Sequence, residues 1–397
     1  MLNESPVTYK KSTHRTKSPE ETLEKIGKIT TEIGLTRTSE ITHLDRIKIP
    51  VYTSVRPLAV EGAVSIYAGK GPSKVHAKVS SIMEAIERYS AEMQDENTVV
   101  KKYDERDCLN PEDLILPRNS YDDDVELEWS EGFSVVTGES ILIPSNAVYH
   151  PYVNDIVKHL FLSNTNGLAS GNSLEEAIFH GMMEVVERDS WSLFEAFKDK
   201  KCEINCNNSS NEYIVELVNK FDEANVSIKL IDLTSENKIP TIGAVSEDLS
   251  LKDHALLKLG IGTHLDPEIA AIRAITEVAQ SRATQIHGTR EDTTRANLLR
   301  ETGYERMKRI NRHWFRDCEE SVDLNDMTDY SQNSFRDNIN KTMELLKLSD
   351  IHDAYYVNLT RSIGIPVVRS IIPGMELFSV DSSRVGKRLI PDNYIVN

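Results

Sequence analysis

An acidic pattern of the form E-x-x-E-R occurs twice in the sequence, at residues 84–88 and at residues 184–188. A polar residue lies four positions before each copy, Ser80 in the first and His180 in the second. In a helix, positions i, i+4 and i+7 lie on one face. Each segment would therefore present two carboxylates beside a hydroxyl or an imidazole.

Two interpretations of these stripes are open. A single stripe is typical of a solvated helix face, where Glu84 and Arg88 would form an ion pair worth about 0.3 kcal/mol. If the two stripes instead face one another, their carboxylates repel and raise each other's pKa. Mg²⁺ removes this repulsion, because it binds carboxylate oxygens and keeps substrate phosphates among its ligands. The second interpretation is a site for ATP and Mg²⁺ lined by two acidic helices.

A third segment would supply positive charge. Residues 266–268, Asp-Pro-Glu, predict a helix start with a cap, an N1 proline and an acidic first turn. Arg273 and Glu277 share one face of that helix, where one interpretation is an intrahelical ion pair. The other is that Arg273, with Arg282 and Arg290 further along, brings cations to the acidic region. Phosphate binding requires such cations.

Glycine-containing turns precede the two acidic helices. Lys70 lies between two glycines just before Ser73, the expected cap of the first helix, where backbone N–H groups and a cation would meet an anion. The segment lacks the spacing of a P-loop, so by itself it indicates a turn. In the second turn, Ser173 and Glu176 form an S-x-x-E capping box after the glycine-rich residues 164–172.

The remaining pattern indicates a mixed α/β (α+β) fold. Helices are expected at 18–34, 74–95, 211–224 and 334–348, and strands at 132–143, 226–233, 240–246, 354–360 and 366–372. We expect residues 1–18 to be a flexible N-terminus, either disordered or loosely docked, and residues 19–397 to form one large domain. The similarity of the segments around residues 84 and 184 suggests an internal repeat.

Composition excludes several classes of protein. The chain has 397 residues, of which 39% are hydrophobic, and a net charge of −17, which argues against binding nucleic acid through a broad basic face. It has no apolar run long enough to span a membrane. Residues 1–17 lack the apolar core of a signal peptide, so we expect a cytoplasmic protein. The four cysteines lack the spacing of a zinc site and are expected to be reduced.

Taken together, these motifs resemble the YcaO family of ATP-using enzymes that modify peptide backbones. The resemblance spans roughly residues 18–378 and depends on the order and spacing of several motifs. These are residues 42–51, Gly69-Lys70-Gly71, Ser80 with Glu84, Glu87 and Arg88, Asn166-Gly167, Ala169, Gly171, Glu176-Ala177, Glu184 with Glu187, Arg188 and Asp189, Arg273 with Glu277, Gln280 and Arg282, residues 288–292, and Pro373-Gly374.

The resemblance implies a YcaO-like fold with an ATP cleft lined by the acidic helices. It implies catalytic roles for Glu84, Glu187 and Arg273. It implies Mg²⁺ ligation by Glu84, Glu87, Glu184 and Glu187. It implies nucleotide binding by Lys70, Ser80, Glu87, Asn172, Glu176, Arg188 and Glu277. In the family, a nucleophile adds to a backbone amide carbonyl, and ATP phosphorylates the oxyanion so that it leaves as phosphate.

The C-terminal residues favour one branch of the family. Members that form azolines end in a proline-rich tail, whereas residues 388–397 contain only Pro391. The chain resembles instead the stand-alone archaeal members, which exchange the amide oxygen of a glycine for sulfur. Their target is the alpha subunit of methyl-coenzyme M reductase, and a TfuA-like partner often assists. We expect a protein or peptide substrate, external sulfide and a homodimer. An azoline-forming cyclodehydratase and a non-catalytic nucleotide-binding subunit remain alternatives.

Overall fold

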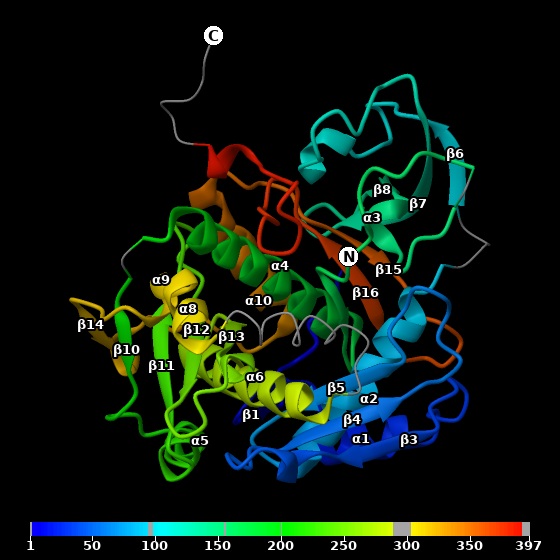
Figure 1. The fold of residues 1–397 in the computed structure, drawn as a ribbon. Coiled ribbons are helices and arrows are strands. Elements are labelled where there is room, and N and C mark those ends of the chain that lie inside the picture. The colour runs from blue at the N-terminus through cyan, green and yellow to red at the C-terminus, as the bar shows by residue number, and fades with distance from the viewer. Residues whose placement is uncertain (1, 94–97, 155, 200, 289–302, 391–397) are drawn as a thin grey trace.

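The computed structural model describes residues 2–93, 98–154, 156–199, 201–288 and 303–390. In this part of the chain, strands form a six-stranded, a five-stranded and a three-stranded sheet and a separate two-stranded hairpin. Figure 1 shows the three larger sheets around the helices α2, α4 and α6. The expected mixed α/β fold is confirmed.

The three-stranded sheet carries the first acidic helix. It is antiparallel, in the order β3 (Arg37–Glu40), β4 (Val51–Val55) and β5 (Ile66–Lys70). Helix α2 (Lys74–Ala91) packs on β4 and β5, and α1 (Pro19–Gly27) packs on α2. Helix α1 is shorter than predicted, because it ends at Gly27 and not at Gly34.

The six-stranded sheet carries the second acidic helix. Its main path is β6 (Thr98–Lys102), β7 (Glu126–Ser134), β15 (Tyr355–Asn358), β16 (Val367–Ile371) and β9 (Leu168–Ser170), with β8 (Ser140–Pro144) paired to β7. The single strand predicted at 132–143 is therefore the β7–β8 hairpin. The short helix α3 (Ser145–Val148) follows β8. Helix α4 (Leu174–Phe197) packs on β16 and β9, and α10 (Phe335–Leu346) packs on α4.

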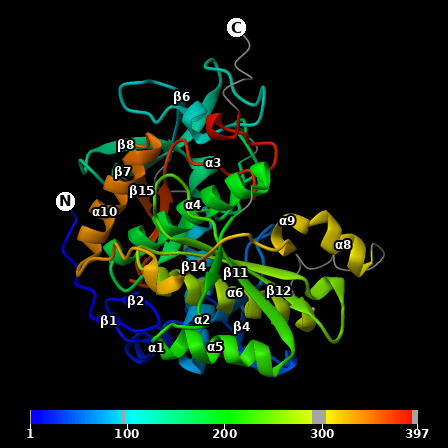
Figure 2. The same ribbon diagram turned by 90° about the vertical axis from the view of Figure 1, so that its left-hand side faces the viewer.

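The five-stranded sheet carries the third helix of the site. Its order is β13 (Lys258–Thr263), β12 (Thr241–Asp248), β11 (Val226–Asp232), β10 (Glu203–Asn205) and β14 (Ser321–Asp323). Alternate residues of β12 point to opposite faces. Ile242 packs with α6 (Pro267–His287) and α5 (Glu212–Glu223), while Val245 packs with the end of α4 and with α9 (Arg312–Phe315). Helices α8 (Tyr304–Ile310) and α9 lie at one side of the molecule (Figure 2).

Glycines let the helices lie directly on the strands that precede them. A Cβ atom built at Gly69 in β5 would lie 2.0 Å from the backbone nitrogen of Ser81 in α2. One built at Gly262 in β13 would lie 2.1 Å from the carbonyl oxygen of Ala270 in α6. Only a residue without a Cβ permits this backbone contact. The two helices are thus held at backbone distance from their strands.

The described residues before α1 contact the rest of the molecule, and the division into a flexible N-terminus and one large domain stays a prediction. Strands β1 (Tyr9–Lys10) and β2 (His14–Arg15) form a hairpin. The carboxylates of Glu175 and Glu176, at the start of α4, accept hydrogen bonds from it and from the residues on either side. Buried carboxylates need such partners, which explains why this polar segment is held in place.

The expected internal repeat is not confirmed. Helices α2 and α4 both follow a strand and a glycine-containing turn, but α2 lies on a three-stranded sheet and α4 on a six-stranded one. Among the described residues, no helix is both long and apolar enough to cross a membrane.

Candidate active site

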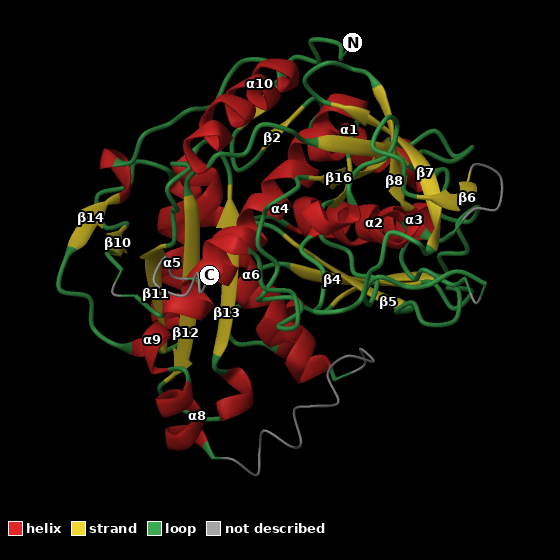
Figure 3. Cartoon of the chain, turned by 90° about the horizontal axis from the view of Figure 1, so that it is seen from above, coloured by secondary structure: helices red, strands yellow, loops and turns green. Residues whose placement is uncertain are grey.

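Helices α2, α4 and α6 lie near the centre of the molecule (Figure 3), with α6 between strands β4 and β13. Each begins at the predicted cap, which is Ser73, Ser173 or Asp266. Their facing surfaces line a cavity of about 370 Å³. All of the residues predicted to form the site line this one cavity: Lys70, Ser80, Glu84, Glu87, Asn172, Glu176, Glu184, Glu187, Arg188, Arg273 and Glu277.

Two carboxylates of the acidic stripes, Glu84 and Glu187, already have hydrogen-bond and ion-pair partners within the protein, here called resident partners. Glu84 accepts a hydrogen bond of 3.2 Å from the backbone N–H of Ala68 and lies 3.5 Å from Arg88. Glu187 accepts one of 3.1 Å from the backbone N–H of Thr263 and lies 3.6 Å from the guanidinium of Arg273. Burial nevertheless raises the pKa of Glu187 to about 7, against the opposing charge of Arg273.

The other two carboxylates have almost none. Within the described part of the chain, Glu87 accepts a single hydrogen bond, of 3.3 Å from the hydroxyl of Ser170, and Glu184 accepts none. Burial raises the pKa of Glu87 to about 8, and the charges of Glu184 and Glu84 add to this effect. Burial also raises the pKa of Glu184. A cation between Glu87 and Glu184 would stabilise both carboxylates.

This donor set suits Mg²⁺, which prefers carboxylate oxygens. Among the described residues, no group of three acidic, histidine or cysteine side chains is arranged to hold a metal ion alone. The other ligands of Mg²⁺ would therefore come from phosphate oxygens and water, as is usual for this ion.

Cations of the cavity face the acidic stripes from β5, α2, α4 and α6. The ammonium of Lys70 contacts the carboxylate of Glu277. Burial opposes ionisation of Glu277, but Lys70 and Arg188 lower its pKa below the ordinary value. The Nε atoms of Arg88 and Arg273 are buried and make no hydrogen bond. Because an unpaired buried donor is costly, these two arginines are suited to bind a ligand anion.

Glu176 differs from the prediction of a capping box. Ser173 accepts a hydrogen bond of 3.2 Å from the backbone N–H of Glu176, as predicted. The side chain of Glu176 does not complete the box but accepts hydrogen bonds from Thr16, Arg15 and Asn172. The carboxylate of Glu176 is directed to the N-terminal segment, where Arg15 and Thr16 donate to both of its oxygens.

Arg282 does not belong to the cavity, contrary to the sequence interpretation. Its side chain is fully buried and donates to Asp45 at 2.8 Å and to Asp248 at 3.2 Å. Arg282 lies on the part of α6 that contacts Asp45 and Asp248, and it therefore has a structural role. Two further predictions, on Arg290 and on the C-terminal residues 391–397, lie outside the described residues.

The sequence interpretation missed several residues that line the cavity: Arg15, Lys17, Thr22, His76 and Arg88. Arg88 is part of the repeated pattern and could have been included on that ground. The basic run between Lys10 and Lys17 carried the only signal for the N-terminal residues.

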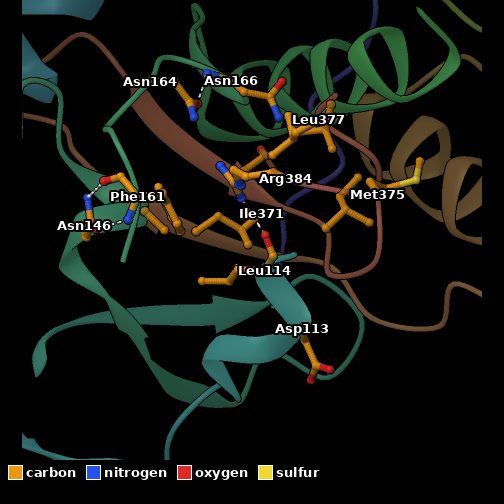
Figure 4. A pocket seen from close by; sticks show the side chains of 14 residues that line it. Asp113, Leu114, Asn146, Phe161, Asn164, Asn166, Ile371, Met375, Leu377 and Arg384 are labelled. Carbon is orange, nitrogen blue, oxygen red and sulfur yellow. Dashed lines mark hydrogen bonds between the residues drawn. The ribbon is translucent and has the colours of Figure 1, made fainter. Parts of the chain in front are cut away.

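A second, smaller pocket of about 50 Å³ is also lined by α4, through Val185, the residue after Glu184. Figure 4 shows Arg384 in this pocket, near Phe161 and Leu114. Its guanidinium donates to the backbone oxygens of Ile115 and Leu114 and lies 3.9 Å from the centre of the Phe161 ring. None of the predicted site residues lines it.

Residues 68–376 match the model of a family described as YcaO cyclodehydratases that bind ATP and Mg²⁺. The chain belongs to the YcaO family. The matched region contains every predicted site residue, and the expected cofactors, ATP and Mg²⁺, are those of the family.

Known YcaO relatives are similar over most of the chain. A protein of Methanothermobacter thermautotrophicus is 54% identical over 94% of this chain and 97% of its own length. A protein from the tfuA 3′ region of Rhizobium leguminosarum bv. trifolii is 31% identical over 70% of this chain and 69% of its own.

Solved YcaO structures share the fold. YcaO from Methanopyrus kandleri, bound with AMPPCP and Mg²⁺, is 29% identical, with a TM-score of 0.81, over 98% of this chain and 99% of that one. A heterocyclase in complex with substrate and cofactor is 23% identical, with a TM-score of 0.82, over 95% of this chain and 54% of that one.

Proposed function

We propose that this YcaO protein uses ATP and Mg²⁺ to install a thioamide on a glycine of a protein substrate in the cytoplasm, with sulfide as the sulfur donor. The proposed substrate is the alpha subunit of methyl-coenzyme M reductase. One observation carries the ATP-dependent part of the proposal, namely that the acidic stripes of α2 and α4 and the cations of α6 and β5 line one cavity.

The residues of the cavity divide by charge into two roles. Glu87 and Glu184, aided by Glu84 and Glu187, would hold Mg²⁺. Arg188, Arg273 and Lys70 would bind the phosphates, with Ser80, Asn172, Glu176 and Glu277 completing the nucleotide site. When bound, Mg²⁺ neutralises charge on the phosphates during transfer. Arg273, with its unpaired Nε, is placed to stabilise the transferred phosphoryl group.

The proposed reaction replaces the amide oxygen in three steps. Hydrosulfide adds to the carbonyl carbon and generates an oxyanion, the γ-phosphoryl group is transferred to that oxygen, and phosphate is expelled as the C=S bond forms. The proton of hydrosulfide ends on phosphate. An amide oxygen is a poor leaving group, and phosphorylation makes it a good one.

The positions of the cysteines favour external sulfide as the sulfur donor. All four are described and unpaired, and none lines the cavity. Burial raises the pKa of each of them, which lowers the fraction of reactive thiolate. A cysteine of this chain is thus poorly suited to carry sulfur to the site.

Two comparisons support a stand-alone protein with a separate partner, as the proposed branch implies. The chain covers 99% of the archaeal Methanopyrus kandleri protein but only 54% of the heterocyclase. One relative comes from the tfuA 3′ region, which supports a TfuA-like partner.

We also propose a homodimer, which light scattering of the purified chain would test.

The test is to incubate the purified protein with a glycine-containing peptide of the proposed target, ATP, Mg²⁺ and sulfide. Mass spectrometry should show the mass difference between sulfur and oxygen on that glycine, with release of ADP and phosphate. The Glu187→Gln variant is the matched inactive control. Loss of water from the peptide would instead indicate azoline formation, and ATP binding without substrate-dependent ADP would indicate an accessory subunit.

A further inference from the structure

The N-terminal residues 3–17, here called the strap, connect three helices. Near α10, the backbone N–H of Phe335 donates to Ser5 and that of Val7 donates to Asn333, both at 2.9 Å. At the start of α2, the ring of His76 lies within hydrogen-bond distance of the hydroxyls of Tyr9, at 3.1 Å, and Ser12, at 3.0 Å. Residues near both ends of the strap bind the first turn of α4.

Two consecutive glutamates of α4 hold the strap. Glu175 and Glu176 are only 2% and 1% exposed. Glu175 accepts hydrogen bonds from the backbone of Asn3 and the hydroxyl of Ser5. Glu176 accepts three from the strap, from the backbone N–H of Thr16 at 2.9 Å, from its hydroxyl at 2.7 Å and from Arg15 at 3.2 Å. With Asn172 as a further donor, both carboxylate oxygens of Glu176 are occupied.

Arg15 faces the cavity, which it lines together with Ser12, Thr13 and Lys17. One guanidinium nitrogen, Nη1, is used for Glu176, and 30% of the side chain remains exposed. Burial lowers the pKa of Arg15, Glu176 and Glu87 favour its charge, and Arg273 disfavours it. Arg15 therefore lines the same cavity as Glu87, a proposed metal ligand, and Arg273, the proposed phosphate-binding arginine.

We propose that Arg15 binds the phosphate chain of the nucleotide, and that Glu176 serves the nucleotide by holding Arg15 and the strap in place. This inference rests on the proposed nucleotide site. A planar guanidinium with free donors is suited to phosphate. Glu176 has no free oxygen for a metal while the strap is docked, so its role is to position Arg15.

The experiment measures binding of a non-hydrolysable ATP analogue with Mg²⁺, and of adenosine, to the full chain by calorimetry. Arg15→Ala should weaken binding of the analogue by about 10- to 100-fold and leave adenosine binding unchanged, because only the analogue has phosphates. Arg15→Lys should retain part of the affinity. Arg336→Ala is the matched control, because Arg336 pairs with Glu4 of the N-terminus at 3.3 Å but does not line the cavity.

Equal weakening of both ligands by Arg15→Ala, or no weakening of either, would overturn the proposal, as would a failure of the unaltered chain to bind the analogue. Thermal unfolding identifies a variant that does not fold. If Arg15→Ala does not fold, the binding of the analogue and of adenosine to Arg15→Lys tests the proposal instead. The assay contains neither peptide nor sulfide. If no thioamide is formed but the Arg15 effect holds, the reaction assignment fails and the role of the strap stands.

Discussion

The two acidic helices carry the same pattern but distribute its charges differently. On α2 the first glutamate, Glu84, has resident partners and the second, Glu87, is almost without them. On α4 the order is reversed, since Glu184 has no hydrogen bond among the described residues and Glu187 is bound to Thr263. The free carboxylate of each helix thus belongs to a different position of the pattern.

Identical sequence patterns therefore need not have identical roles. What surrounds a carboxylate decides whether it is already satisfied or available to a ligand. Glu84 and Glu187 bind the backbones of β5 and β13 and so fix the helices to neighbouring strands. Glu87 and Glu184, which raise each other's energy when charged, are the pair that a divalent cation would stabilise most.

The largest effect is expected when the free pair is altered. Glu87→Gln or Glu184→Gln should reduce ATP turnover by about 10³-fold, because metal stabilisation of the transferred phosphoryl group is worth several kcal/mol. Steady-state release of ADP measures this. Glu84→Gln should reduce turnover less, because part of the role of Glu84 is to bind Ala68. Equal losses of turnover in all three variants would contradict the assignment of Glu87 and Glu184 as the carboxylates that are free to bind the metal.

Two arginines of α6, Arg282 and Arg273, should differ in how much their removal lowers the free energy of unfolding. Arg282→Ala leaves Asp45 without its partner in the interior and should lower the free energy of unfolding by about 3–5 kcal/mol. Arg273→Ala should destabilise less, because the Arg273 side chain is 30% exposed and Glu187 keeps its hydrogen bond from Thr263, and should reduce ATP turnover. Urea denaturation measures the first effect. If both variants unfold at the same urea concentration, the assignment of a structural role to Arg282 but not to Arg273 is wrong.

The raised pKa of Glu87 predicts how stability depends on pH in the metal-free protein. Since this pKa moves from the ordinary 4.5 to about 8, the protonated form is favoured in the folded state. Stability is present in full below pH 4.5 and is lost as the pH rises through about 8, by about 5 kcal/mol in all, since each pKa unit corresponds to about 1.4 kcal/mol.

Thermal unfolding in the presence of a chelator, at several pH values, measures this loss. Glu87→Gln should flatten the profile, while Glu131→Gln, at an exposed position of β7, should not. A wild-type profile that rises over the same interval would contradict the assignment of Glu87 as the unpaired carboxylate.

The smallest effect is expected for Asn172, which donates to Glu176 at 3.4 Å and accepts a hydrogen bond of 3.2 Å from Thr22. Asn172→Ala should weaken ATP binding about threefold, because it removes neutral hydrogen bonds near the site and no charge. Calorimetry with the ATP analogue measures this. A loss as large as that of Glu87→Gln would show that hydrogen bonding, not charge, dominates the site.

The elements that position the site could be predicted because local signals marked them. Ser73, Ser173 and Asp266 begin helices in the sequence interpretation and in the structure alike. The i, i+4, i+7 spacing placed the acidic residues on shared faces, and order and spacing of motifs placed them in one family.

The rest depended on contacts between residues distant in sequence. Arg273 and Arg282 lie on the same helix, but only the positions of Asp45 and Asp248 show that the second is structural. Likewise, the N-terminal segment is polar and basic, and its own sequence does not show that it binds the buried carboxylates of Glu175 and Glu176. No local pattern reports such pairings.

The glycines beneath α2 and α6 have a consequence for how the site could evolve. Because Gly69 and Gly262 set helix and strand at backbone contact, the depth at which each helix rests depends on missing side chains. A methyl group at either position would lift its helix and move a whole row of charges away from the opposite wall. Substrate preference can therefore diverge through the loops around the cavity, whereas the distance across it is fixed by main-chain atoms.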